Sequence, residues 1–181
     1  MFVRALFADS RCNGKLFVLG GSAGAAHAAY VTSTGNDCCD KPQRAVLMAG
    51  QYDYTYFNDA WNPTLRLLLV QYCGCLDTDT TLLQSGSPSY VSTLATANPL
   101  FLINSSADHN TPPVEGDLMM AALAAAGAKG YSRFITPGTD HVFTLWTRYN
   151  VKQMATAFML AGLNMPPKVR IPRVMVGRRA L

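Results

Sequence analysis

Three short runs of almost unbroken apolar residues lie at residues 16–19, 44–50 and 99–104, and a fourth run, at residues 131–136, mixes apolar with polar residues. None alternates between polar and apolar positions, as a strand with one solvent-exposed face would. Short uninterrupted runs of this kind are typical of strands that are buried on both faces. The pattern therefore predicts four strands of a parallel sheet.

Between the runs, apolar residues return every three or four positions, which predicts helices. The predicted helices lie at residues 1–9, 23–34, 64–72, 111–126 and 142–160. Residues 52–62 are aromatic and irregular, and residues 85–89 form a turn cluster. Strands that alternate with helices indicate an α/β fold, a parallel sheet with helices on both faces. The stretch between the second and third strands is long for a crossover, and we expect it to overhang the active site.

Length and composition fit one folded domain. The chain has 181 residues, of which 49% are hydrophobic and 14% charged, so it has enough apolar side chains for a core. No apolar run approaches the roughly 20 residues that a membrane span needs. We expect a domain at residues 1–163 and a basic, flexible tail at residues 164–181.

Most of the net charge of +4 comes from that tail. Five of the 15 basic residues lie between Lys168 and Arg179, where no acidic residue occurs. The body is then close to neutral, unlike a nucleic-acid-binding domain, whose charge covers a folded face. No nucleic-acid partner is expected. The N-terminus has no signal-peptide pattern, which favours a cytoplasmic location.

Five cysteines stand at Cys12, Cys38, Cys39, Cys73 and Cys75. Their spacing does not match a zinc site. Free, partly buried thiols are the simpler interpretation. A disulfide between the two close pairs is the alternative, and it would imply an oxidising compartment.

The first strand ends in Gly20-Gly21-Ser22-Ala23-Gly24, followed by an Ala-rich helix. This G-x-S-x-G pattern between strand and helix is typical of a sharp turn that exposes a nucleophilic serine. Glycine at the flanking positions avoids Cβ clashes between strand and helix. The Ala23 N–H, at the helix N-terminus, is the predicted oxyanion donor. A plain or phosphate-binding glycine turn is the alternative.

Two further candidates follow strands of the predicted sheet: Asp108 after the third and His141 after the fourth. Ligands and chemistry gather at the carboxyl ends of parallel strands. The order Ser22, Asp108, His141 is that of the α/β-hydrolase triad. His141 would take the Ser22 proton, and Asp108 would orient the imidazole.

Each candidate has a rival. Asp53 follows the second strand and could replace Asp108 as the acid. Asp140 is expected to be a solvated turn residue, and His27 and His109 to make structural hydrogen bonds. No H-E-x-x-H or C-x-x-C motif occurs, so no metal site is expected.

These motifs, with Ser87-Pro88-Ser89-Tyr90-Val91 and Ala107-Asp108 before Thr111-Pro112, occur in an order that resembles α/β-hydrolases. The similarity runs from Phe2 to about Gly162. It is to the carboxyl-terminal part of esterases and lipases, near the hormone-sensitive-lipase-like and feruloyl-esterase-like members. It implies hydrolysis of a small-molecule carboxylic ester through an acyl-enzyme on Ser22, without a cofactor. Amide bonds, as in related serine peptidases, remain open.

In that family further strands and a His-Gly-Gly loop precede the nucleophile strand. The loop supplies the other oxyanion donors, and this sequence lacks it. The sequence therefore resembles a truncated hydrolase. A non-catalytic remnant that binds or oligomerises is the alternative function. The first strand would also lack a neighbour on one side, which predicts a homo-oligomer formed through that edge.

Overall fold

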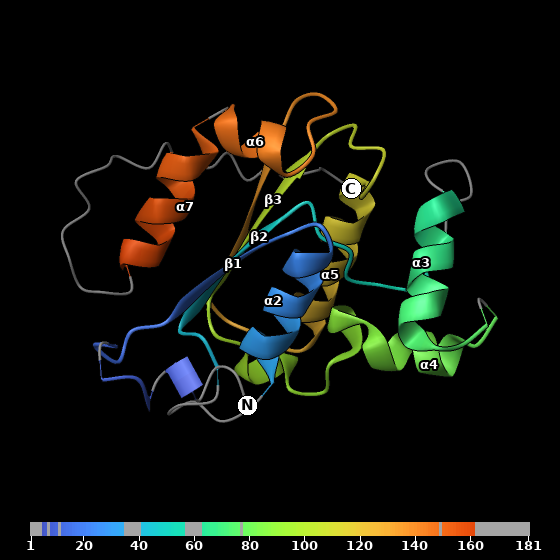
Figure 1. Cartoon of the computed structure of the whole chain (residues 1–181), viewed down its shortest axis with the longest axis horizontal. Helices are drawn as coiled ribbons and strands as arrows, with labels where there is room; N and C mark the ends of the chain where they lie inside the picture. Colours follow the sequence, from blue (N-terminus) through green and yellow to red (C-terminus); the bar gives the residue numbers. More distant parts are fainter. Residues whose placement is uncertain are drawn as a thin grey trace.

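The four predicted strands form one sheet in a computed structural model of the chain, which describes residues 5–6, 8–10, 12–34, 41–56, 63–76, 78–148 and 150–161. The strands are β1 (Phe17–Gly21), β2 (Arg44–Met48), β3 (Leu100–Ser105) and β4 (Tyr131–Thr136). They lie side by side in chain order, and all pairs are parallel (Figure 1). The carboxyl ends of all four strands therefore lie at the same end of the sheet.

Helices cover both faces of this sheet. Helices α2 (Ala23–Ser33) and α5 (Pro113–Ala125) pack on one face, in a core with Leu47 and Leu102. Helices α6 (Phe143–Thr147) and α7 (Val151–Leu160) pack on the other, with Val46 and Ile103. Successive strand residues thus alternate between two apolar cores, which explains the unbroken apolar runs. The α/β fold class is confirmed.

The long stretch between β2 and β3 holds two α-helices, α3 (Pro63–Cys73) and α4 (Thr80–Gly86). Two 3₁₀ turns follow, η1 (Pro88–Tyr90) and η2 (Leu94–Thr96). Figure 1 shows α3 and α4 at the right of the view, outside the helices that flank the sheet. The predicted turn at residues 85–89 is wrong in detail, because α4 extends through Gly86 and η1 begins at Pro88.

A small third core attaches this insertion to the body. It contains Ala26 from α2, Tyr54 and Leu83, with Leu69 and Cys73 packed against it. Leu68 and Tyr72, also on α3, are 54% and 59% exposed. One narrow face of α3 contacts the body, and a wide apolar face is left in solvent.

The predicted helix at residues 142–160 is two helices. Asn150, which precedes α7, adopts a left-handed conformation with φ 56°, and this backbone cannot continue a right-handed helix. Before the break, Arg148 extends to a carboxylate in the preceding loop, Asp140, with Nη1 3.1 Å from both oxygens. Periodicity carries across such a break, so the sequence pattern alone merges α6 and α7.

Both ends of the chain lie largely outside the described residues. Ala5, Leu6 and Ala8 of the predicted first helix are helical and Asp9 is a bend, whereas residues 1–4 and 7 lie outside the described residues. Residues 162–181 are likewise outside, so the domain boundary at 163 and the basic tail remain predictions. None of the described helices combines the length and hydropathy of a membrane-spanning segment.

Candidate active site

Ser22 occupies a strained turn between β1 and α2. Its φ of 54° and ψ of −125° lie outside the regions that residues with a side chain normally adopt. The Ser22 N–H donates to the Met48 carbonyl at 2.9 Å, which extends the β1–β2 ladder by one residue. Strain of this kind marks the nucleophile turn of α/β-hydrolases.

The glycines around Ser22 are not equivalent. A Cβ added at Gly20 would lie 2.2 Å from the Gly24 carbonyl oxygen, so strand and helix approach too closely for any side chain there. A Cβ added at Gly24 would meet nothing within 4 Å. The predicted steric requirement for glycine is therefore borne out at Gly20 and wrong at Gly24.

Ser22 also stands at the N-cap of α2. Serine is a preferred N-cap residue, yet among the described residues its side chain makes no capping hydrogen bond. Its hydroxyl is therefore not committed to the helix. Ala23 is the first residue of α2, and its N–H is one of the four at a helix start that have no partner within the helix.

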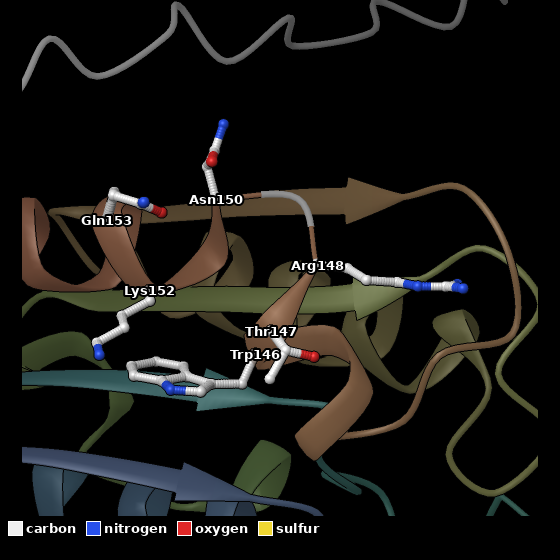
Figure 2. Close-up of a pocket in the computed structure, with 6 residues that line it drawn as sticks. All are labelled: Trp146, Thr147, Arg148, Asn150, Lys152 and Gln153. Carbon is white, nitrogen blue, oxygen red and sulfur yellow. The ribbon is translucent and has the colours of Figure 1, made fainter.

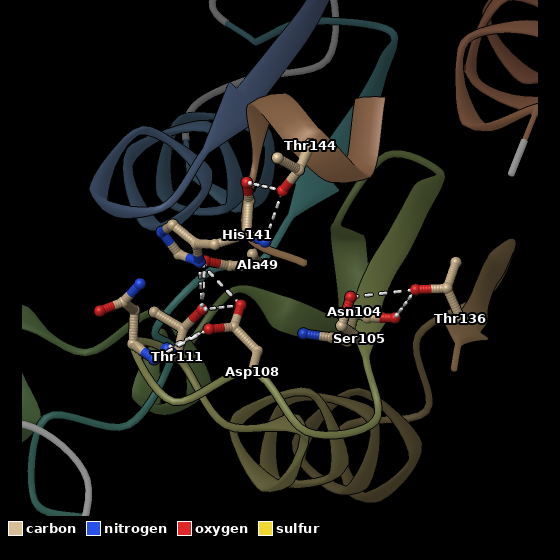
Figure 3. Close-up of polar contacts among 9 residues, drawn as sticks. Ala49, Asn104, Ser105, Asp108, Thr111, Thr136, His141 and Thr144 are labelled. Atoms are coloured by element: carbon tan, nitrogen blue, oxygen red, sulfur yellow. Dashed lines mark hydrogen bonds and ion pairs between the residues drawn. The ribbon is translucent and has the colours of Figure 1, made fainter. Parts of the chain in front are cut away.

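Asp108 and His141 are brought together by the ends of β3 and β4. His141 Nδ1 lies 2.7 Å from Asp108 Oδ2, and the Asp108 side chain is fully buried (Figure 3). Asp108 Oδ1 accepts the N–H groups of Asn110, at 2.8 Å, and Thr111, at 3.2 Å. The carboxylate is thus fixed, and the Nδ1–H tautomer that it favours leaves Nε2 as a proton acceptor.

The His141 loop packs directly against the serine turn. A Cβ added at Gly21 would lie 2.5 Å from Cγ1 of Val142, the residue after His141. Val142 has a φ of 37°, which is unusual for a β-branched residue. The His141 backbone N–H donates to the Thr144 hydroxyl, which donates back to the His141 carbonyl (Figure 3). These contacts hold the neighbours of Ser22 and His141 against each other.

The rival residues lie in other environments. Asp53 Oδ1 accepts from the Thr55 N–H and hydroxyl, at 2.9 and 2.5 Å, so these side-chain hydrogen bonds stay within its own loop. Asp140, predicted to be solvated, is only 8% exposed and pairs with Arg148, which corrects that expectation. His27 is exposed and contacts the Tyr72 ring edge-on at 5.5 Å. His109 is exposed beside the buried acid.

Two residues of the site were not predicted. The Thr111 hydroxyl lies 2.8 Å from the Ala49 carbonyl and 3.2 Å from Asp108 Oδ2, so it joins the end of β2 to the acid loop (Figure 3). Ala49 has a φ of 48°, an uncommon conformation for alanine. The Thr111-Pro112-Pro113 helix start was visible in the sequence, but nothing in it indicated that the hydroxyl faces the acid.

Glu115 was also missed. It lies in the first turn of α5, is 2% exposed, and its Oε2 accepts the backbone N–H groups of Tyr52, at 2.8 Å, and Asp53, at 3.0 Å. Burial raises the pKa of Glu115 to about 7, and the two N–H donors oppose that rise. Glu115 thereby ties the loop after β2 to the helix that follows the acid.

A separate cavity of about 270 Å³ lies at the break between α6 and α7. Trp146, Arg148, Asn150 and Lys152 are among the residues that line it (Figure 2). Ser22 and His141 are not among them, so this cavity is not the space in front of the serine. Within the described ranges, no three His, Cys, Asp or Glu side chains come together as a metal site would require.

The sequence matches the model of the prolyl oligopeptidase family over residues 3–165. The chain belongs to this family. It is therefore part of a serine hydrolase family with the α/β-hydrolase fold, which confirms the resemblance seen in the sequence. No curated protein matches the chain significantly.

Solved structures of both peptidases and esterases share the fold. A puromycin-hydrolysing peptidase from Mycobacterium tuberculosis is 23% identical, with a TM-score of 0.75 over 93% of this chain. The Pyrococcus horikoshii acylaminoacyl peptidase is 14% identical, with a TM-score of 0.66 over 89%. An esterase from Thermogutta terrifontis is 19% identical, with a TM-score of 0.67 over 93%.

The chain spans only part of each of these proteins. It covers 25% of the Mycobacterium peptidase, 26% of the Pyrococcus peptidase and 63% of the Thermogutta esterase. At these identities the similarity establishes the fold. It does not choose between ester and amide substrates.

Proposed function

We propose that this member of the prolyl oligopeptidase family hydrolyses carboxylic esters through an acyl-enzyme on Ser22. The observation that carries the proposal is the 2.7 Å pair between His141 Nδ1 and the buried Asp108, in a loop that packs on the strained Ser22 turn. Ser22, Asp108 and His141 also occur in the α/β-hydrolase order, and each follows a strand whose carboxyl end lies at the same end of the sheet.

The reaction follows from the roles of the three groups. Ser22 Oγ attacks the ester carbonyl while His141 Nε2 accepts its proton, and Asp108 stabilises the imidazolium that forms. The Ala23 N–H donates to the oxyanion. His141 then protonates the leaving alcohol, and a water molecule, activated by the same imidazole, releases the acid and restores Ser22.

The test is hydrolysis of p-nitrophenyl acetate by the wild-type chain and by Ser22→Ala. We expect a burst of p-nitrophenol, equal to the enzyme concentration, that Ser22→Ala abolishes. Ser106→Ala is the matched control, because Ser106 is an exposed serine just after β3 whose hydroxyl accepts the Gly138 N–H in the loop after β4. Equal rates for wild type and Ser22→Ala would refute the proposal.

A peptidase activity is the second candidate, favoured by the family match and by the peptidases among the solved structures. Acyl transfer to serine is common to both reactions, so the substrate decides. Parallel assays on an aminoacyl p-nitroanilide and the corresponding p-nitrophenyl ester separate them. Faster turnover of the anilide would replace the ester proposal with the peptidase one.

A non-catalytic remnant is the remaining alternative, because Ala23 is the single oxyanion donor that the sequence pattern supplies. Loss of one such donor costs about 2.7–4 kcal/mol of transition-state stabilisation. A fluorophosphonate probe tests this directly. Stoichiometric labelling of Ser22 would support a competent nucleophile, and a folded but unlabelled protein would support the remnant.

A further inference from the structure

Cys73 and Cys75 face each other across the end of α3. Gly74, between them, has a φ of 64°, and the Cys75 N–H donates back to the Val70 carbonyl at 3.2 Å. The Gly74 N–H donates to the Gln71 carbonyl at 3.3 Å. This pair of bonds is a Schellman motif, which reverses the chain sharply at a left-handed glycine. The reversal brings the backbone of Cys75 back toward the last turn of α3, which ends at Cys73.

Both thiols are free and partly buried in this structure. Burial is the main cause that raises the pKa of Cys73, and the neighbouring Cys75 thiol adds to it through charge and a hydrogen bond. A Cβ added at Gly86 would lie 3.3 Å from Cys73 Sγ and 3.4 Å from the Tyr54 ring. Cys73 and Cys75 both pack against the small core that attaches the α3–α4 insertion, and the two thiols are within hydrogen-bonding reach of each other.

We propose that Cys73 and Cys75 form a two-thiol redox site, which a small disulfide such as oxidised glutathione converts into an intrachain Cys73–Cys75 disulfide. The Cys75 thiolate attacks one sulfur of the oxidant and expels the first glutathione thiolate. Cys73 then loses its proton and attacks Cys75 Sγ, which expels the second. The two thiols lose two protons and two electrons, and one glutathione disulfide becomes two glutathione molecules.

Cys75 is assigned the first attack because burial raises the pKa of the Cys73 thiol, which lowers the fraction of Cys73 present as the attacking thiolate. The closure of the ring has a structural consequence. An S–S bond of about 2.05 Å is shorter than any contact between two thiols. One or both sulfur atoms then move relative to the small core that contains Tyr54, against which Cys73 and Cys75 pack. Oxidation therefore alters the contact between α3 and the body, where Ala26 of the helix that begins after Ser22 also lies.

The experiment incubates the full chain with oxidised glutathione and follows it by intact-mass analysis and peptide mapping after alkylation. We expect a loss of two hydrogens and an internally linked peptide holding both residues, at a rate that does not depend on protein concentration. Cys73→Ser should stop at a glutathione adduct on Cys75. Cys12, a free thiol elsewhere in the chain, should remain alkylatable or form only the adduct.

The readout of structure is hydrogen exchange in α3 and α4, which should differ between the reduced and oxidised chain. In Cys73→Ser and Cys75→Ser the oxidant should leave it unchanged. The proposal is overturned by separate glutathione adducts on Cys73 and Cys75. It is equally overturned by bonds from either residue to another cysteine or chain, or by no reaction while Cys12 is modified.

Discussion

Single side chains at this site act through contacts that can be removed one at a time. His141 depends on the Asp108 carboxylate, which is itself held by two backbone N–H groups. Ser22 depends on the absence of a side chain at Gly20. Both dependencies are local, so each gives a prediction at the level of one residue.

Asp108→Asn should reduce ester turnover by about 10⁴-fold, because an amide holds the wrong imidazole tautomer while preserving the geometry. Asp53→Asn is the matched control. Asp53 contacts Thr55 in its own loop, so turnover should fall far less. The comparison is kcat for the two variants on the same ester. The reverse ranking would move the acid to the end of β2.

Gly20→Ala should destabilise the fold by about 1–3 kcal/mol, because the new methyl group collides with the Gly24 carbonyl. Gly24→Ala, in the same motif, has open space around its Cβ and should cost nothing measurable. Urea unfolding of both variants gives the two free energies of unfolding. Equal losses would show that the steric account of the turn is incorrect.

The elements differ in how far the sequence predicts them. The four strands and α2, α3 and α5 follow from apolar runs, helical spacing and the stop signals at Gly74 and Gly127, both of which have positive φ. The break before α7 could not be predicted from the sequence. Asn150 can adopt either a helical or a left-handed backbone, and its surroundings in the fold decide between the two. The pairing of Asp108 with His141 could be predicted, since the carboxyl ends of neighbouring strands converge in a parallel sheet.

The burial of charged side chains could not be predicted from the sequence. Arg133 on β4 is nearly buried, and its Nε donates to the Asn104 side-chain oxygen at 2.9 Å while Nη1 pairs with Asp117 at 2.6 Å. Glu115 is buried because two backbone N–H groups of a distant loop meet it. A charged residue in a sequence normally indicates a solvent-exposed position. The partners that permit the burial of Arg133 and Glu115 come from other parts of the chain, so the local sequence does not reveal them.

The attachment of α5 through Glu115 should make stability depend on pH. Its pKa is raised in the fold to about 7, so between roughly pH 4.5 and 7 the folded state binds more protons than the unfolded one. Stability contributed by the protonated group is therefore present at low pH and lost as the pH rises through 7, by up to about 3 kcal/mol.

Glu115→Gln keeps an oxygen acceptor for the Tyr52 and Asp53 N–H groups but does not titrate. The free energy of unfolding is measured at pH 5 and at pH 7.5. Its decrease from pH 5 to pH 7.5 should be smaller in this variant than in the wild type. Asp117→Asn, on the same helix and 69% exposed, is the control and should retain the wild-type dependence. A wild-type profile in Glu115→Gln would contradict the account.

At the scale of the molecule, the two edge strands are β1 and β4. In the described part of the chain, β1 has a paired strand only on its β2 side, and Leu19 on it is 42% exposed. An unpaired apolar edge is a template for association with a second chain. The body is also near neutral, so charge repulsion does not oppose contact.

We therefore expect the isolated chain to form a homodimer through β1, measured by size-exclusion chromatography with light scattering. Leu19→Lys should shift it toward monomer, because a charged edge resists pairing. Ile135→Lys, on β4 and 47% exposed, is the matched control and should leave the dimer intact. A wild-type monomer that melts cooperatively would refute association through this edge.

The strand order β1-β2-β3-β4 has a consequence for the order in which the site is assembled during synthesis. During synthesis the serine turn leaves the ribosome before the Asp108 and His141 loops do, and each later strand adds to the sheet beside the one before it. Asp108 arrives after β3, and His141 arrives only with β4, the last strand of the described chain. If the proposed function is right, a nascent chain carries the predicted nucleophile long before it carries the predicted base. Hydrolytic competence would then wait until β4 has joined the sheet and the histidine loop has packed onto the serine turn.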